Sequence, residues 1–225
     1  MADQTEAFAT FKRNITRPTS LQRMFDAGSL KPKKGERRSA GKPTKDENEL
    51  IRASVIITIG ALDAYLSDVA AEVLIAQMRT STARTDEARA LLRRVLREVD
   101  TLPLELAILT DQAAREDLIG DALRDHLTSK VSNHGARGVA GTVERMGRKM
   151  DWSRLAASVP TALGYQTDPT SPAGLLDAWT DRRHKLVHRG TPLLITSVRA
   201  RALVKFVAAI VEEVDAQATA AIAEA

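Results

Sequence analysis

The sequence predicts an all-α protein: a single helical bundle preceded by an N-terminal helix and a basic linker. Apolar residues recur at spacings of three and four along most of the 225 residues, and no segment alternates as a strand would. Aromatic residues make up only 4% of the chain, whereas Ala, Leu, Val, Arg and Glu dominate, which favours helices over β-sandwiches and barrels. The length suffices for a sizeable core without disulfide bonds. The absence of cysteine excludes thiolate metal sites, Fe–S clusters and cysteine nucleophiles.

Residues 1–45 are predicted to hold the N-terminal helix and the linker. A helix is expected from about residue 5 to residue 25, interrupted near Pro18. Residues 28–44 combine two Pro and three Gly with many Lys and Arg, a composition typical of a flexible linker. Residues 31–45 alone carry a net charge of +6, so the other 210 residues sum to −2. This segment is either a basic arm that contacts phosphates or a solvated connection.

Residues 46–225 are predicted to form the bundle. Its clearest helix opens at Asp46, because acidic residues occupy the first turn, where the helix dipole favours them. One face of this helix is apolar at helical spacing: Ile51, Val55, Ile59, Leu62, Leu66, Val69 and Val73. Further helices are expected over residues 85–100, 104–129, 139–155, 173–189 and 196–221. The glycine-rich residues 132–141 and the turn-rich residues 165–172 are expected to be loops.

The N-terminal region lacks the pattern of a secretory signal. Residues 1–14 are polar and of mixed charge, without an apolar core region. The longest apolar stretch, residues 53–62, is far shorter than the roughly 18 residues expected of a membrane span. We therefore expect a cytoplasmic protein that has no membrane partner.

Common catalytic motifs are missing from the sequence. It has no G-x-S-x-G elbow, no Walker sequence, no H-E-x-x-H and no evident pair of catalytic carboxylates. Gly135, Gly138 and Gly141 are regularly spaced, but no Lys-Ser/Thr follows them, so an ordinary connection is favoured over a phosphate-binding loop.

Residues 182–189, the basic octad, form the most unusual segment. Six of its eight residues are Arg, Lys or His, and its Arg and Lys residues give a charge of +4. Such a cluster suits an anion such as phosphate, which Arg binds through two parallel hydrogen bonds. The alternative is a solvated helix end, where cations complement the helix dipole and Asp181 pairs with Lys185. His184 and His188 share a helical face, but no carboxylate lies between them and cations surround them, so neither a metal nor a cofactor is predicted.

The octad also contains a family motif. Arg183 to His188 forms R-x4-H with a polar residue, His184, directly after the Arg. Arg182 satisfies an R-x5-H spacing, so the identity of the motif Arg stays open. The motif ends a late helix that is followed by Gly-x-Pro and one last amphipathic helix, and residues 52–68 look like a long first core helix. In these features, residues 46–216 resemble the HEPN superfamily of helical domains, most closely the type associated with RNA-ligase and phosphatase repair genes.

The resemblance implies a metal-independent endoribonuclease. Members of this kind are often toxins, defence proteins or RNA-processing effectors, and they dimerise so that two copies of the motif line one cleft. The implied partners are therefore RNA, a second copy of the chain and an antitoxin or RNA-repair protein. The alternative is a non-catalytic dimer that binds RNA or serves as a helical scaffold.

The implied catalytic residues are Arg183, which would hold the phosphate, and His188, which would transfer protons. Residues five apart differ by roughly 140° on a straight helix. Either a helix distortion, a wrapping Arg side chain or a second subunit must therefore bring the two together. Predicted substrate contacts are Arg182, His184, Lys185, Arg189, Asp63 and Tyr65. The alternatives are a solvated acid for Asp63 and a core aromatic with a solvated hydroxyl for Tyr65.

Overall fold

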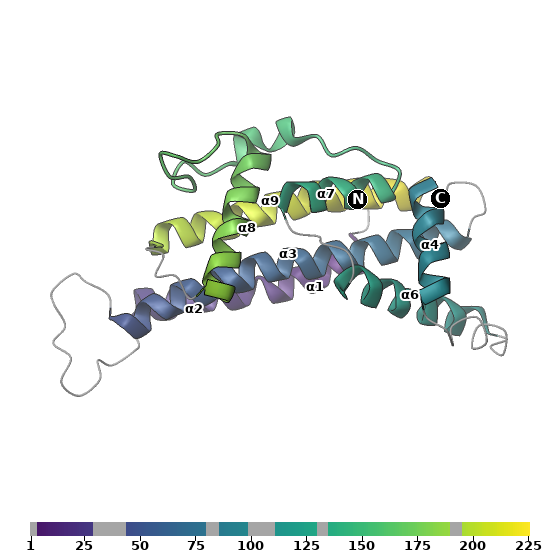
Figure 1. Cartoon of the computed structure of the whole chain (residues 1–225), viewed down its shortest axis with the longest axis horizontal. Coiled ribbons are helices and arrows are strands. Elements are labelled where there is room, and N and C mark those ends of the chain that lie inside the picture. Colours follow the sequence, from purple (N-terminus) through teal and green to yellow (C-terminus); the bar gives the residue numbers. More distant parts are fainter. Residues whose placement is uncertain (1–3, 29–43, 80–85, 99–110, 130–134, 190–194) are drawn as a thin grey trace. The chain divides into compact units, whose positions relative to one another are not determined.

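The computed structural model describes residues 4–28, 44–79, 86–98, 111–129, 135–189 and 195–225. Within these ranges every regular element is a helix and no strand occurs, which confirms the predicted all-α class (Figure 1). The elements are α1 (Glu6–Asn14), α2 (Thr16–Asp26), α3 (Lys45–Arg79), α4 (Asp86–Glu98), α6 (Gln112–Ser129), α7 (Gly135–Arg145), the 3-10 helix η1 (Trp152–Ser158), α8 (Pro172–Arg189) and α9 (Ser197–Ala223).

The longest helix of the described residues, α3, confirms the predicted buried face. It begins with a reciprocal cap, because the Glu47 amide donates to the Thr44 hydroxyl (3.1 Å) and the Thr44 amide donates to the Glu47 carboxylate (2.7 Å). All seven apolar residues predicted to share a face are at most 1% exposed: Ile51, Val55, Ile59, Leu62, Leu66, Val69 and Val73. The 3.6-residue repeat therefore located the core along the whole helix.

The same helix is long and apolar enough to span a membrane by length and composition alone. However, 56% of its most apolar 18-residue window is buried inside the structure. The central helix of a folded core can have the same length, hydropathy and burial. The hydropathy of α3 is therefore only weak evidence for a membrane span.

The contacts divide the chain into two compact units. Unit 1 comprises residues 1–10, 63–151 and 211–225, and unit 2 comprises residues 11–62 and 152–210. Both units therefore contain part of α1, part of α3 and part of α9. The basic linker, residues 31–45, lies outside the described residues except for its last position, Lys45, where α3 starts.

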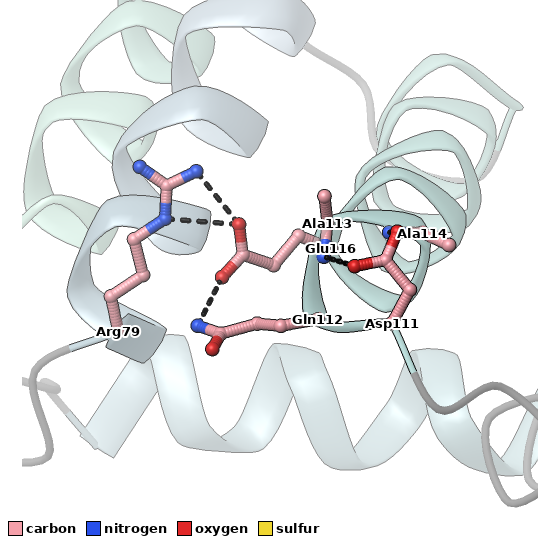
Figure 2. A network of polar contacts seen from close by, with 6 residues as sticks. All are labelled: Arg79, Asp111, Gln112, Ala113, Ala114 and Glu116. Atoms are coloured by element: carbon pink, nitrogen blue, oxygen red, sulfur yellow. Dashed lines mark hydrogen bonds and ion pairs between the residues drawn. The ribbon is translucent and has the colours of Figure 1, made fainter.

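In unit 1, α3, α4 and α6 enclose an apolar cluster. It consists of Ala70, Ala71, Leu74, Ala88, Leu91, Leu92, Val95, Leu123 and Leu127. At the end of α3, Glu116 accepts hydrogen bonds from Arg79 (2.7 and 3.0 Å) and from Gln112 (2.9 Å), while Asp111 caps the first amides of α6, as Figure 2 shows. This exposed network ties the end of α3 to the start of α6.

The first turn of α1 is fixed within unit 1 by three polar contacts, of which the one from Thr5 to Asp215 is buried. The amides of Glu6 and Ala7 each donate to the Glu72 carboxylate at 3.1 Å, which satisfies helix-terminal donors through a residue of another helix. Thr5 donates from its hydroxyl to Asp215 of α9 (2.5 Å), and Phe8 is buried. The first turn of α1 thus belongs to the core of this unit.

The glycine-rich residues 132–141 were predicted to be a loop; residues 132–134 lie outside the described residues, and for residues 135–141 the prediction was wrong. Gly135, Gly138 and Gly141 all lie within α7, whose apolar side buries Val139 and Val143. Gly135 and Gly138 are themselves buried, and Gly135 begins the helix with a φ of 72°, in the left-handed region that favours glycine. The helix predicted over residues 139–155 instead ends at Arg145. Gly147 follows with a φ of 80°, and the Arg148 amide donates back to the Val143 carbonyl (3.0 Å).

The interruption predicted near Pro18 lies earlier. The break between α1 and α2 is at Ile15, and Pro18 is the third residue of α2. An amide at that position has no acceptor within its own helix, so the missing N–H of proline costs nothing there.

In unit 2, α2 is held by two side-chain contacts. Gln22 donates to the buried Ser54 hydroxyl of α3 (2.6 Å), and Asp26 pairs with Arg201 of α9 (2.5 Å). The remaining predictions for α8 and α9 are confirmed to within a few residues at each end. Val198, in the first turn of α9, is apolar but 52% exposed.

Candidate functional site

The basic octad occupies the last turns of α8 in unit 2. The helix starts in a favourable way, with Pro172 as its first residue and the Ser171 hydroxyl accepting from the Gly174 amide (3.2 Å). Its buried side includes Leu176 and Trp179, and the indole Nε1–H of Trp179 donates to the Leu163 carbonyl (3.2 Å). The apolar first half of α8 therefore anchors the helix and fixes the direction of its basic end.

Arg182 is the most constrained cation of the octad. It forms an ion pair with Asp168 (2.5 Å), and only 16% of the Arg182 side chain and 6% of the Asp168 side chain are exposed. Its guanidinium also lies 4.3 Å from the ring centre of Tyr165 and 5.1 Å from that of Trp179. Arg182 is thus part of the interior. Arg183, the arginine of the R-x4-H spacing, is not in this ion pair and is the better candidate for the motif arginine.

Asp168 holds the preceding turn segment against α8. Its carboxylate also accepts from the Tyr165 amide (2.9 Å), and Arg199 of α9 stacks on the same Tyr165 ring at 4.0 Å. Burial alone would raise the pKa of Asp168. The hydrogen bonds from Arg182 and Tyr165, with the charges of Arg182 and Arg199, hold that pKa below its ordinary value. The carboxylate therefore stays ionised and keeps Arg182 in place.

His184 and His188 lie side by side on the exposed face of α8. Their ring centres are 4.5 Å apart with an angle of 44° between the planes, and both residues are exposed. Lys185 pairs with Asp181 at 2.6 Å, which confirms the contact expected of a solvated helix end. The octad thus presents two neighbouring imidazoles to solvent.

Arg183 and His188 are not brought together within one chain by a bend in the helix. The octad is regular α-helix throughout, so the two residues keep the angular separation of a straight helix. Arg183 is half-buried, and its buried Nε has no hydrogen-bond partner among the described residues. The side chain of Arg189 lies outside the described residues.

Asp63 and Tyr65, the other predicted substrate contacts, belong to unit 1. Tyr65 is only 2% exposed, and its hydroxyl donates to Asp215 (3.4 Å). Burial, followed by the charge and hydrogen bond of Asp215 and the charge of Glu72, raises the pKa of Tyr65 well above its ordinary value. Tyr65 is therefore a core aromatic, as its alternative interpretation stated, but its hydroxyl is buried rather than solvated as that interpretation expected. Asp63 is half-buried.

Two open grooves lie in unit 1, with volumes of about 410 and 430 Å³. The first is lined mostly by residues of α3 and α6, both charged and apolar, and the second by Phe8, Asp215 and residues of α9. Neither groove is lined by Asp63, Tyr65 or the octad. The chemistry predicted for α8 therefore belongs to an exposed helix face rather than to either groove.

Sequence reasoning missed the residues that support the octad: Asp168, Tyr165 and Arg199. They come from a turn segment and from the next helix, and only the fold brings them to Arg182. An acidic residue in a turn that precedes a basic helix is a weak signal, because many such residues are solvated.

Comparison of the chain with protein-family models, with curated proteins and with solved structures finds no match.

Proposed function

We propose that the protein is a metal-independent endoribonuclease of the HEPN type, in which two copies of α8 form one site. The observation that carries the proposal is the exposed pair of imidazoles, His184 and His188, beside Arg183 on a helix end rich in cations. Imidazoles transfer protons near neutral pH, and arginine binds phosphate oxygens. An antitoxin or RNA-repair protein as partner, and a cytoplasmic location, belong to the same proposal.

The reaction needs three things from the site. The 2′-hydroxyl of RNA loses its proton as it attacks the phosphorus, and the leaving 5′-oxygen gains a proton. The negative charge that builds on the phosphate oxygens requires a cation. In the proposed site His188 transfers a proton, His184 contacts the substrate and Arg183 holds the phosphate.

The geometry of in-line attack explains why the proposed site needs a second subunit. The attacking and leaving oxygens lie on opposite sides of the phosphorus, whereas His184 and His188 are neighbours on one helix face. One pair therefore approaches the phosphate from one side, and a twofold partner presents its own pair from the other. A twofold axis also duplicates Arg183, which the straight helix keeps away from His188 of the same chain.

The test is an RNA cleavage assay in EDTA with purified full-length protein. His188→Ala and Arg183→Ala should each lower the cleavage rate by about 100-fold or more, the size expected for loss of a proton-transfer group or a phosphate contact. Arg137→Ala, which removes an exposed arginine from α7, serves as the control and should cleave normally. Equal activity in all three variants would rule out the proposed site.

A non-catalytic RNA-binding dimer is the second candidate. It is favoured by the straight helix, which keeps Arg183 away from His188 of the same chain, so that Arg183 can contact a phosphate without proton transfer by that His188. This function predicts salt-dependent RNA binding without cleavage, weakened by Arg183→Ala. Light scattering tests the dimer that both functions require, and a strict monomer at micromolar concentration would contradict it.

A further inference from the structure

We propose that His184 and His188 together form a binding site for a zinc ion on the exposed face of α8. The ring centres are 4.5 Å apart. Two nitrogens bound to one tetrahedral zinc ion lie about 3.3 Å apart, since each Zn–N bond is about 2.0–2.1 Å. Both side chains are exposed, so small rotations of their torsion angles suffice to direct one nitrogen of each ring toward a shared ion.

The charges around the pair favour this site more than the sequence suggested. Lys185 is neutralised by Asp181 (2.6 Å), and Arg182 is turned inward to Asp168 (2.5 Å). Two of the cations expected to repel a divalent ion are therefore already paired within the protein.

The donor set selects the type of metal. Imidazole nitrogens suit Zn²⁺ and its neighbours Cu²⁺ and Ni²⁺, whereas Mg²⁺ and Ca²⁺ prefer oxygen ligands. Among the described residues no third His, Asp or Glu completes a ligand group, so water would fill the other positions. The site is therefore an exchangeable one rather than a closed structural zinc site.

Binding at this site does not depend on the proposed ribonuclease activity, but its effect does. A zinc ion on His188 occupies the nitrogen lone pair with which this residue would take up a proton. Zinc should therefore inhibit RNA cleavage, and EDTA should restore it. This makes the pair a point at which free zinc regulates the proposed activity.

Calorimetric titration of the full-length protein with ZnCl₂ tests the binding without RNA. One zinc ion per chain is expected, and His184→Gln and His188→Gln should each weaken binding on the order of 100-fold, because each leaves a single imidazole without the chelate effect. His134→Gln removes a histidine outside the described residues and should bind zinc normally. MgCl₂ should give no binding. Circular dichroism checks that the variants keep their helices.

Two results would overturn the zinc site. One is zinc binding that persists unchanged in both single variants, and the other is no zinc binding at concentrations up to the millimolar range. Binding that both variants weaken supports the site even where the protein cleaves no RNA. Failure of the ribonuclease proposal and failure of the zinc site are thus separate outcomes.

Discussion

The protein has two groups of polar side chains in opposite environments. In unit 1, Thr5, Tyr65 and Asp215 are at most 6% exposed, and both hydroxyls donate to the same carboxylate oxygen of Asp215. In unit 2, His184 and His188 are exposed at the end of α8. The first group satisfies its hydrogen bonds internally, as buried polar atoms must, whereas the second presents imidazoles to solvent. Internal pairing marks a structural role, and donors left at the surface mark a candidate site.

The largest effect on stability is expected from Asp215→Ala. Two buried hydroxyls, those of Thr5 and Tyr65, lose their shared acceptor, so the free energy of unfolding should fall by about 3 kcal/mol. Urea denaturation followed by circular dichroism measures this loss. RNA cleavage per folded molecule should not change. Full stability with loss of cleavage would show instead that the buried group takes part in the chemistry.

Asp168→Asn should lower the free energy of unfolding by about 2 kcal/mol at pH 7, because Arg182 loses a charged partner in a largely buried place. The pKa of Asp168 is lowered in the folded protein. Its stabilising effect is therefore present above the unfolded pKa, about 3.9, and is lost as the pH falls through the folded pKa. In urea denaturation, the difference between wild type and variant should be larger at pH 7 than at pH 3. An equal difference at both pH values would contradict the ion pair.

Tyr65→Phe removes one hydrogen bond and should cost about 1 kcal/mol of unfolding free energy. The raised pKa of Tyr65 gives a second measurement. In a spectrophotometric titration, this phenol should stay protonated above pH 10, where an exposed tyrosine ionises. The late component should be missing from the variant. If Tyr65 instead ionised at the pH of an exposed tyrosine, its hydroxyl would be in contact with solvent. The contrast between the buried Asp215 group and the exposed histidines would then be lost.

The smallest effect is expected from Lys185→Ala. Its ion pair with Asp181 joins neighbouring turns of one helix, and both side chains are well exposed, so solvent screens the interaction. The free energy of unfolding should change by less than about 0.5 kcal/mol. Thermal unfolding should therefore give nearly the wild-type midpoint. A much larger loss would indicate that Lys185 also stabilises the octad by other contacts.

The sequence predicted most of the helices because their burial follows a simple repeat. All seven residues expected on one face of α3 are buried, and α8 and α9 lie where they were predicted. The prediction failed at α7, where glycine composition suggested a loop. Gly135 begins the helix with a positive φ and Gly138 is buried within it, and composition alone does not distinguish a loop glycine from a helix glycine.

The candidate site was predictable only in part. The octad stands out in the sequence, and the pairing of Lys185 with Asp181 follows from their spacing. The inward role of Arg182 does not, because Asp168 and Tyr165 approach it through a turn segment whose path the local pattern does not determine. The sequence also gave no reason to prefer Arg183 over Arg182, and the ion pair with Asp168 supplies one.

The carboxylate of Glu72 at the start of α1 has a consequence for hydrogen exchange. The first amides of a helix normally have no internal acceptor and exchange quickly with solvent. Here the amides of Glu6 and Ala7 donate to Glu72 from another helix. These two amides should exchange slowly with deuterium, and faster exchange would report that α1 has separated from α3 before the rest of the protein unfolds. They are therefore natural markers for local opening at this end of unit 1.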